Sequence, residues 1–164
     1  MTVRMASSFD GELPEAVFDP IRLAAVVESG LLDAAPESAF DDLAQLALAI
    51  TGADKAFFTV ADARRSFWKT AVGTDAAAGR ENDIRDSPCH LLVGTGRELI
   101  AEEAARDPRI KDLAAIGALD IGAWAGYPVL SPTATYWAAS ASATTPPDPS
   151  PPLSARHCGP WPGR

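Results

Sequence analysis

The chain has 164 residues, of which 47% are hydrophobic, and this is enough for one hydrophobic core. Its formal net charge of −8 argues against a nucleic-acid-binding surface and against docking on an anionic membrane, because both need clustered Lys and Arg. No apolar run is long enough to span a bilayer, and residues 1–18 lack the apolar segment of a signal peptide. We therefore expect a cytoplasmic protein with a flexible leader over residues 1–18.

Two amphipathic helices are predicted next. The first begins near Asp19-Pro20, because Asp is a good N-cap and Pro suits the first helical position. Its apolar residues recur at helical spacing as far as Leu32. The second helix runs from about residue 36 to residue 51, with acidic residues in its first half, where the helix dipole favours them. Gly52 is its predicted C-cap.

The following residues change to an aromatic and β-branched pattern, which is typical of strands. A short polar turn separates two such segments, so we expect an antiparallel hairpin. The predicted elements are strands at 56–60 and 66–72, a polar loop at 73–88, a helical turn at 90–93, a short strand at 98–101, a short helix at 113–119 and a strand at 122–130. This order predicts an α+β fold with an antiparallel sheet.

An ordered set of short motifs runs through these elements. They are Asp19-Pro20-x-Arg22-Leu23-x-Ala25, Gly30-Leu31-Leu32-Asp33, Pro36-Glu37-x-x-Phe40-Asp41-x-Leu43, Phe67-Trp68-Lys69 with Val72-Gly73, Ser87-Pro88-Cys89, Asp107-Pro108-Arg109 and Ala125-Gly126-Tyr127-Pro128-Val129. Together they resemble GAF domains of bacterial signalling proteins, over residues 19–132. The resemblance implies an antiparallel sheet of about six strands, with helices packed on one face and a pocket on the other.

The resemblance also implies a function. Such domains bind a small molecule or mediate dimerisation, and they control an output domain such as a PPM-type serine phosphatase, a sensor kinase or a cyclic-dinucleotide enzyme. The chain itself has no Gly-rich phosphate loop and no kinase motif, so we expect a sensory or regulatory domain, not an enzyme. An alternative is that it is the N-terminal fragment of a PPM-type phosphatase or a sensor histidine kinase. The sequence identifies neither the ligand nor a cofactor.

Cys89 and His90 form a Cys/His pair. A thiolate beside an imidazole can act as a redox or covalent site, and the chain is then similar to GAF-type methionine sulfoxide reductases. That reaction would need further cysteines to resolve the oxidised one. The alternative is that Cys89 is a small buried apolar residue. Two adjacent ligands do not make a zinc site, and no nucleophile–base–orienter set is visible, so no catalytic or metal residue is assigned.

Five other residues are candidates for ligand contacts. Trp68 and Trp124 are expected to line a ligand pocket, although aromatic residues on strands more often belong to the core. Arg80, Arg85 and Asp86 lie in the predicted loop that would cover a GAF pocket, so they are the expected polar contacts.

Residues 133–164 differ from the rest of the chain, because they hold 7 of the 14 prolines and a single acidic residue, Asp148. One interpretation is a natural disordered tail rich in Pro, Ala, Ser and Thr. The other is out-of-frame translation. When the codons are read one base earlier, Tyr136-Trp137 forces Leu and Trp137-Ala138 forces Gly, and permitted bases complete the run Asp-Gly-His-Val-Leu-Gly-Ser-Phe-Cys-Val-Ser-Asp. The resemblance implies such a closing strand, so we expect a one-base deletion near Pro132 and a domain that lacks its last strand.

Overall fold

A computed structural model of the chain describes residues 11–74, 79–131 and 136–144. Residues 1–10 of the expected leader, and residues 133–135 and 145–164 of the expected tail, lie outside these ranges. No helix within them is both long and apolar enough to cross a membrane.

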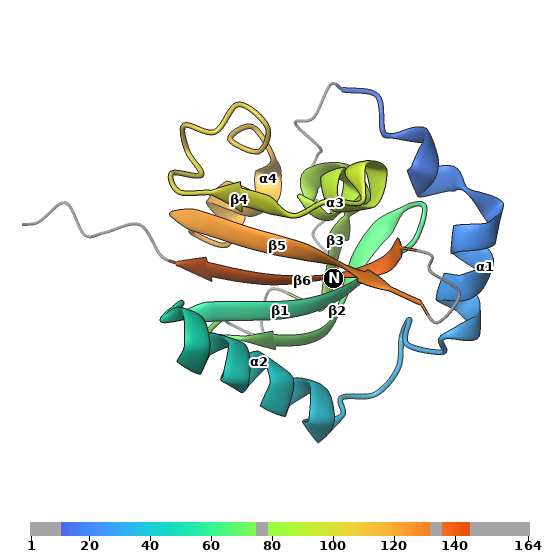
Figure 1. The fold of residues 1–164 in the computed structure, drawn as a ribbon, viewed down its shortest axis with the longest axis horizontal. Coiled ribbons are helices and arrows are strands. Elements are labelled where there is room, and N and C mark those ends of the chain that lie inside the picture. The colour runs from blue at the N-terminus through green and yellow to red at the C-terminus, as the bar shows by residue number, and fades with distance from the viewer. Residues whose placement is uncertain (1–10, 75–78, 132–135, 145–164) are drawn as a thin grey trace, which may run out of the picture.

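The centre of the fold is one antiparallel sheet of six strands, in the order β3-β2-β1-β6-β5-β4 (Figure 1). The strands are β1 (Lys55–Ala61), β2 (Arg65–Val72), β3 (Glu81–Asp83), β4 (Leu99–Ala101), β5 (Ala123–Leu130) and β6 (Tyr136–Thr144). The predicted α+β class with an antiparallel sheet is therefore confirmed. The predicted hairpin is also confirmed, since β1 and β2 pair in antiparallel register.

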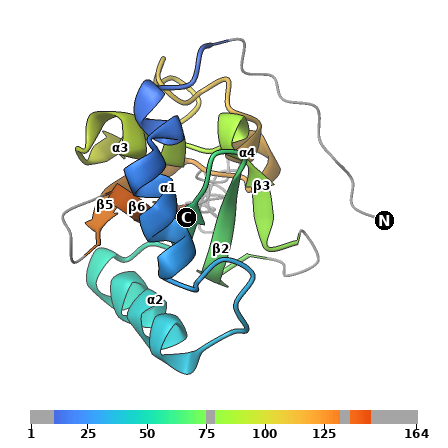
Figure 2. The same cartoon turned by 90° about the vertical axis from the view of Figure 1, so that its right-hand side faces the viewer.

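Helices cover both faces of the sheet. The two long helices, α1 (Pro20–Glu28) and α2 (Ser38–Thr51), lie on one face, where Val26 packs against Val60 of β1. These are the face-packed helices that the resemblance implies. The opposite face carries the short elements η3 (Ile84–Asp86), α3 (Cys89–Thr95) and α4 (Ala114–Ala118). Figure 2 shows α3 and α4 on the side of the molecule away from α2. The larger part of the core lies between this face and the short helices.

The two predicted helix caps are present. The Asp19 carboxylate accepts hydrogen bonds from the backbone N–H groups of Ile21 at 2.8 Å and Arg22 at 3.0 Å. At the end of α2, Gly52 has φ +70°, the left-handed conformation that a C-capping glycine adopts at little cost. These local signals fix where α1 begins and where α2 ends.

Residues 15–18, expected within the flexible leader, form the short helix η1 (Glu15–Phe18). Val17 is fully buried in the core, and its carbonyl accepts a hydrogen bond from the Arg22 guanidinium at 2.6 Å. The ordered part of the domain therefore begins before Asp19, because an apolar side chain and a buried cation fasten this segment to the sheet.

The expectation that the closing strand is missing is wrong. β6 occupies the slot between β1 and β5, pairing with β1 from Lys55↔Ala143 to Val60↔Ala138 and with β5 along its length. The prediction relied on side-chain patterning, and this segment has little. Backbone hydrogen bonding does not require such a pattern, and without β6 both β1 and β5 would expose unpaired backbone groups in the middle of the fold.

The polar loop predicted at 73–88 is also partly wrong. Glu81–Asp83 forms β3 at the sheet edge, with Ser66 of β2 opposite Asn82, and η3 follows it directly. Three polar residues carry no alternating apolar pattern, so the pairing could not be read from the sequence. It places Asn82 beside the strand that bears Trp68.

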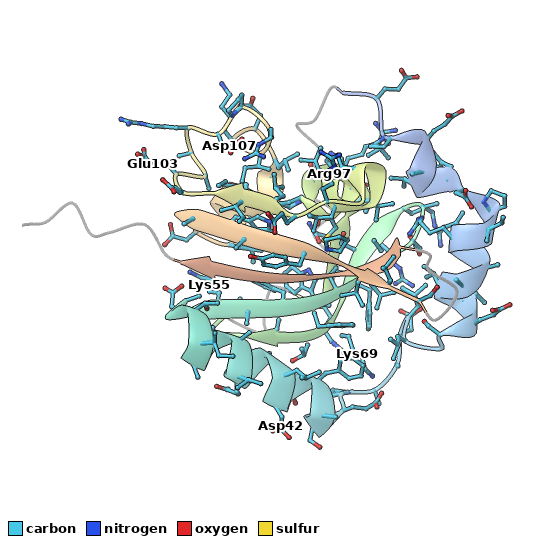
Figure 3. The ribbon with its side chains drawn as sticks, viewed as in Figure 1. Asp42, Lys55, Lys69, Arg97, Glu103 and Asp107 are labelled. Atoms are coloured by element: carbon cyan, nitrogen blue, oxygen red, sulfur yellow. The ribbon has the colours of Figure 1, made fainter. Side chains whose placement is uncertain are left out.

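A bulge in β2 determines which side chains reach the cavity described below. Phe58 pairs with Thr70 and Thr59 with Trp68, so Lys69 is an extra residue in the ladder. Lys69 and Thr70 consequently both reach the α2 side, where Lys69 contacts Glu37 and Thr70 contacts Asp41. Figure 3 shows Lys69 on that side of the sheet. The Trp68 ring lies on the opposite face, against Phe57.

Candidate functional site

A small cavity lies between the sheet and the short helices. Its free space is about 10 Å³, which accommodates about one water molecule. The strands contribute one wall and the segments around η3, α3 and α4 contribute the other. The lining residues are Phe57, Thr59, Trp68, Asn82, Ser87, Pro88, Cys89, Ala115, Leu119 and Trp124.

Aromatic rings form the sheet wall of the cavity. Phe57 lies between two indoles, with ring centroids 5.5 Å from Trp68 and 6.3 Å from Trp124. All three side chains are buried. The two tryptophans that the sequence singled out therefore both line the cavity, although they come from strands on opposite sides of β1 and β6.

Polar atoms lie among these rings. The Asn82 Oδ1 and the Trp124 Nε1 are buried and have no hydrogen-bond partner among the described residues. The same holds for Oδ1 of Asp86, whose residue is 3% exposed and precedes the lining residue Ser87. Buried polar atoms are nearly always paired, so the unpartnered atoms of the two lining residues Asn82 and Trp124 call for a ligand, an ion or water.

Cys89 begins α3 and lines the cavity, but its thiol is not activated. Burial raises the pKa of the thiol, and the neighbouring hydroxyls of Ser87, Ser66 and Thr59 oppose this only in part. A thiol with a raised pKa stays protonated at neutral pH and is a poor nucleophile. The arrangement matches the alternative in which Cys89 is a small buried residue.

His90 does not form a dyad with Cys89. Successive helix residues point in different directions, and the Nδ1 of His90 lies 3.0 Å from the carbonyl oxygen of Ile84. The ring is fully buried, and desolvation lowers its pKa, so the imidazole is neutral at pH 7. His90 fastens α3 to η3 and is absent from the cavity lining.

The two predicted arginine contacts do not line the cavity. The Arg80 guanidinium donates to the carbonyls of Ala34 at 3.2 Å and Lys69 at 3.0 Å, and it stacks over the Phe67 ring on the α2 side of the sheet. Arg85 is exposed. The expected loop would have let both fold over the pocket, but β3 and η3 fix them elsewhere.

The sequence did not predict Thr59, Asn82 or Ser87 as ligand contacts, although Ser87 belongs to the motif Ser87-Pro88-Cys89. One signal was available for Thr59, since alternate strand residues share a face and Thr59 therefore lies on the same face as Phe57. Asn82 could not be found without the β2–β3 pairing. No cluster of His, Cys, Asp and Glu that could hold a metal ion is present in the described ranges.

The sequence matches no protein-family model and no curated protein. Solved structures do resemble the fold. The GAF domain of an Acinetobacter phosphoenolpyruvate-protein phosphotransferase is similar over 84% of this chain and 85% of that chain, at 12% identity and a TM-score of 0.55. A Staphylococcus aureus NreA protein mutated in its nitrate-binding site is similar over 66% of this chain and 84% of that chain, at 12% identity and a TM-score of 0.53.

A type II free methionine-R-sulfoxide reductase from Thermoplasma acidophilum also resembles the chain, over 65% of this chain and 72% of that chain, at 15% identity and a TM-score of 0.52. Identities this low establish a shared fold and no shared activity. Proteins with different functions therefore share this fold. The chain has an α+β fold of the GAF type.

Proposed function

We propose that the chain is a sensory or regulatory domain that binds a small molecule in the cavity and thereby controls an output domain. The observation that carries this proposal is the pair of unpartnered buried polar atoms on the lining residues Asn82 and Trp124, within an aromatic wall. Apolar packing alone gives no reason for such atoms, whereas a ligand with matching hydrogen bonds would satisfy them.

Binding, not catalysis, is the proposed activity. A solved structure with this fold is a methionine sulfoxide reductase, so the fold alone does not decide between the two. The raised pKa of the Cys89 thiol and the engagement of the His90 imidazole with Ile84 both support a non-catalytic site. A PPM-type phosphatase or a sensor histidine kinase, joined to this domain in the same protein, is the proposed output.

A thermal-shift screen of the full chain against small metabolites tests the proposal. A ligand at a hundred times its Kd stabilises the folded state by about 2.7 kcal/mol, which raises the Tm by several degrees. Ala115→Leu adds a larger side chain to the cavity wall and should abolish the shift, whereas Ala118→Leu on the exposed side of α4 should preserve it. A hit that survives Ala115→Leu would place binding elsewhere.

Dimerisation is a second proposed activity, supported by α2. Leu43, Leu46 and Ile50 are 57%, 54% and 75% exposed, and their spacing of three and four residues places them on one stripe. Their exposure would be costly in isolation, and a matching stripe on a second copy would bury them.

A separate proposal concerns the origin of residues 133–164. We propose that a one-base deletion near the Pro132 codon produced them, and that the intact gene continues into the output domain. The β6 slot would then receive the restored strand in place of Tyr136–Thr144. Resequencing the DNA around that codon decides the point, because an unchanged frame with no continuation downstream would leave a natural tail.

A further inference from the structure

The charge of the cavity wall distinguishes between classes of ligand. None of the lining side chains in the described part of the chain is charged. The buried cations of the described residues have other partners: Arg22 donates to the carbonyl of Ala61 at 2.7 Å, Lys69 to that of Ala35 at 2.7 Å and Lys55 to that of Asp120 at 3.2 Å. An ion of either sign loses hydration on entering the cavity, and an anion meets no compensating cation there.

The aromatic rings of the cavity wall favour a cation. The faces of Trp68, Phe57 and Trp124 carry negative electrostatic potential, and such faces attract a cation within about 6 Å of a ring centroid. Tryptophan is the strongest of the aromatic side chains in this role. Two indoles and one phenyl ring around a single cavity therefore favour a positively charged group.

Oxygen acceptors in the cavity wall also suit a positively charged N–H donor. The unpartnered Oδ1 of Asn82 can accept a hydrogen bond from an N–H donor. The Ser87 hydroxyl already accepts from the backbone N–H of Cys89 at 3.2 Å, and the hydroxyls of Ser87 and Thr59 each keep capacity for a further donor. Trp124 Nε1 is an unpartnered donor on another lining residue, and one indole N–H does not replace a cation for an anionic ligand.

The free space sets the size of the group that enters. About 10 Å³ accommodates one water molecule, and an ammonium group is of similar size. We propose that the cavity binds the protonated head of a small primary amine, and that it discriminates against anions. This inference rests on the proposed ligand-binding function and adds the chemical class of the ligand.

Methylammonium chloride is the probe for the first test, with sodium nitrate and potassium chloride at equal ionic strength as comparisons. The readout is the indole N–H signals of the full chain in ¹H–¹⁵N NMR spectra, assigned with Trp68→Phe and Trp124→Phe. Methylammonium should shift the Trp68 and Trp124 signals saturably, and neither nitrate nor potassium should do so. A saturable shift with nitrate but not with methylammonium would overturn the inference while leaving ligand binding in place.

Substitutions at Asn82 provide the second test, because this half-buried residue of an edge strand tolerates change better than the rings do. Asn82→Asp adds a negative charge of nearly the same shape and should tighten methylammonium binding about tenfold. Asn82→Lys supplies a competing ammonium group and should weaken it at least tenfold, while Gln45→Lys on the exposed side of α2 should leave it unchanged. Equal affinity in Asn82→Asp and the wild type would contradict the proposal.

A cavity filled by one water molecule only is the remaining outcome, and it also overturns the inference. In that case none of the three salts shifts the indole signals. The metabolite screen with Ala115→Leu tests ligand binding separately. A failure of the amine inference can therefore be distinguished from a failure of the proposed function.

Discussion

The indole of Trp68 and the phenyl ring of Phe57 pack against each other on the cavity face, with centroids 5.5 Å apart and ring planes inclined at 59°. Phe57 comes from β1 and Trp68 from β2, and the bulge at Lys69 determines that Trp68 reaches this face. The pair therefore belongs both to the core and to the cavity wall.

Trp68→Ala should destabilise the domain by about 3–5 kcal/mol, because it removes a large buried ring from the core. Tyr127→Ala is the control, since Tyr127 is an aromatic residue on β5 that is about half exposed, and its loss should cost about 1 kcal/mol or less. Urea unfolding followed by circular dichroism measures both. Similar costs for the two variants would mean that the Trp68 ring is not buried as described.

Arg22 should contribute more to the free energy of unfolding than an exposed arginine does. Its guanidinium is buried and donates to the carbonyls of Ala16, Val17 and Ala61, so it joins η1 and α1 to the end of β1. Arg22→Met leaves these acceptors without their donor and should cost at least about 2 kcal/mol. Arg64→Met at an exposed site should change the free energy of unfolding by about 0.5 kcal/mol or less. Equal effects in the same urea assay would refute this role.

Cys89 should make the domain less stable at alkaline pH. Burial raises the pKa of its thiol in the folded state, so the folded protein holds the proton more tightly than the unfolded chain. The associated stability is complete below the unfolded thiol pKa of about 8.5 and is lost as pH rises through the folded value. A Cys158→Ser background isolates the effect, and Cys89→Ala should flatten the dependence between about pH 8 and 10. An unchanged slope in Cys89→Ala would show that the thiol is not the titrating group.

The exposed stripe on α2 predicts self-association. Leu46→Lys places a charge in the middle of the stripe and should shift the chain from dimer to monomer in sedimentation equilibrium, lowering the association constant at least tenfold. Gln45→Lys introduces the same charge on the neighbouring exposed residue and should have a much smaller effect. A wild-type chain that is monomeric at high micromolar concentration would exclude α2 as a dimer interface.

Helix ends and the β1–β2 hairpin were predictable from the sequence, and the pairing of β3 and β6 was not. Asp19 and Gly52 mark helix ends because each satisfies backbone groups within its own helix. Arg80 was misplaced because its position depends on β3 joining the sheet edge, which no side-chain pattern in Glu81–Asp83 indicates. β6 was missed for the same reason, since hydrogen bonds to β1 and β5 hold it in the sheet.

Only the residues of the candidate site with distinctive side chains were predictable from the sequence. Trp68, Trp124 and Cys89 were found because their side chains carry distinctive chemistry, and all three line the cavity. Thr59 and Asn82 are ordinary polar residues whose significance comes from burial among aromatic rings, and burial is a property of the tertiary fold. Val17 lies in a segment that looked unstructured, yet it is fully buried.

Native mass spectrometry of the freshly purified full chain tests the central claim most directly. If the cavity is a ligand site, a bound small molecule should appear at up to one copy per chain, remain with Ala118→Leu and disappear with Ala115→Leu. A chain that carries no small molecule as purified, and acquires none at one copy per chain from a metabolite extract, would contradict the account.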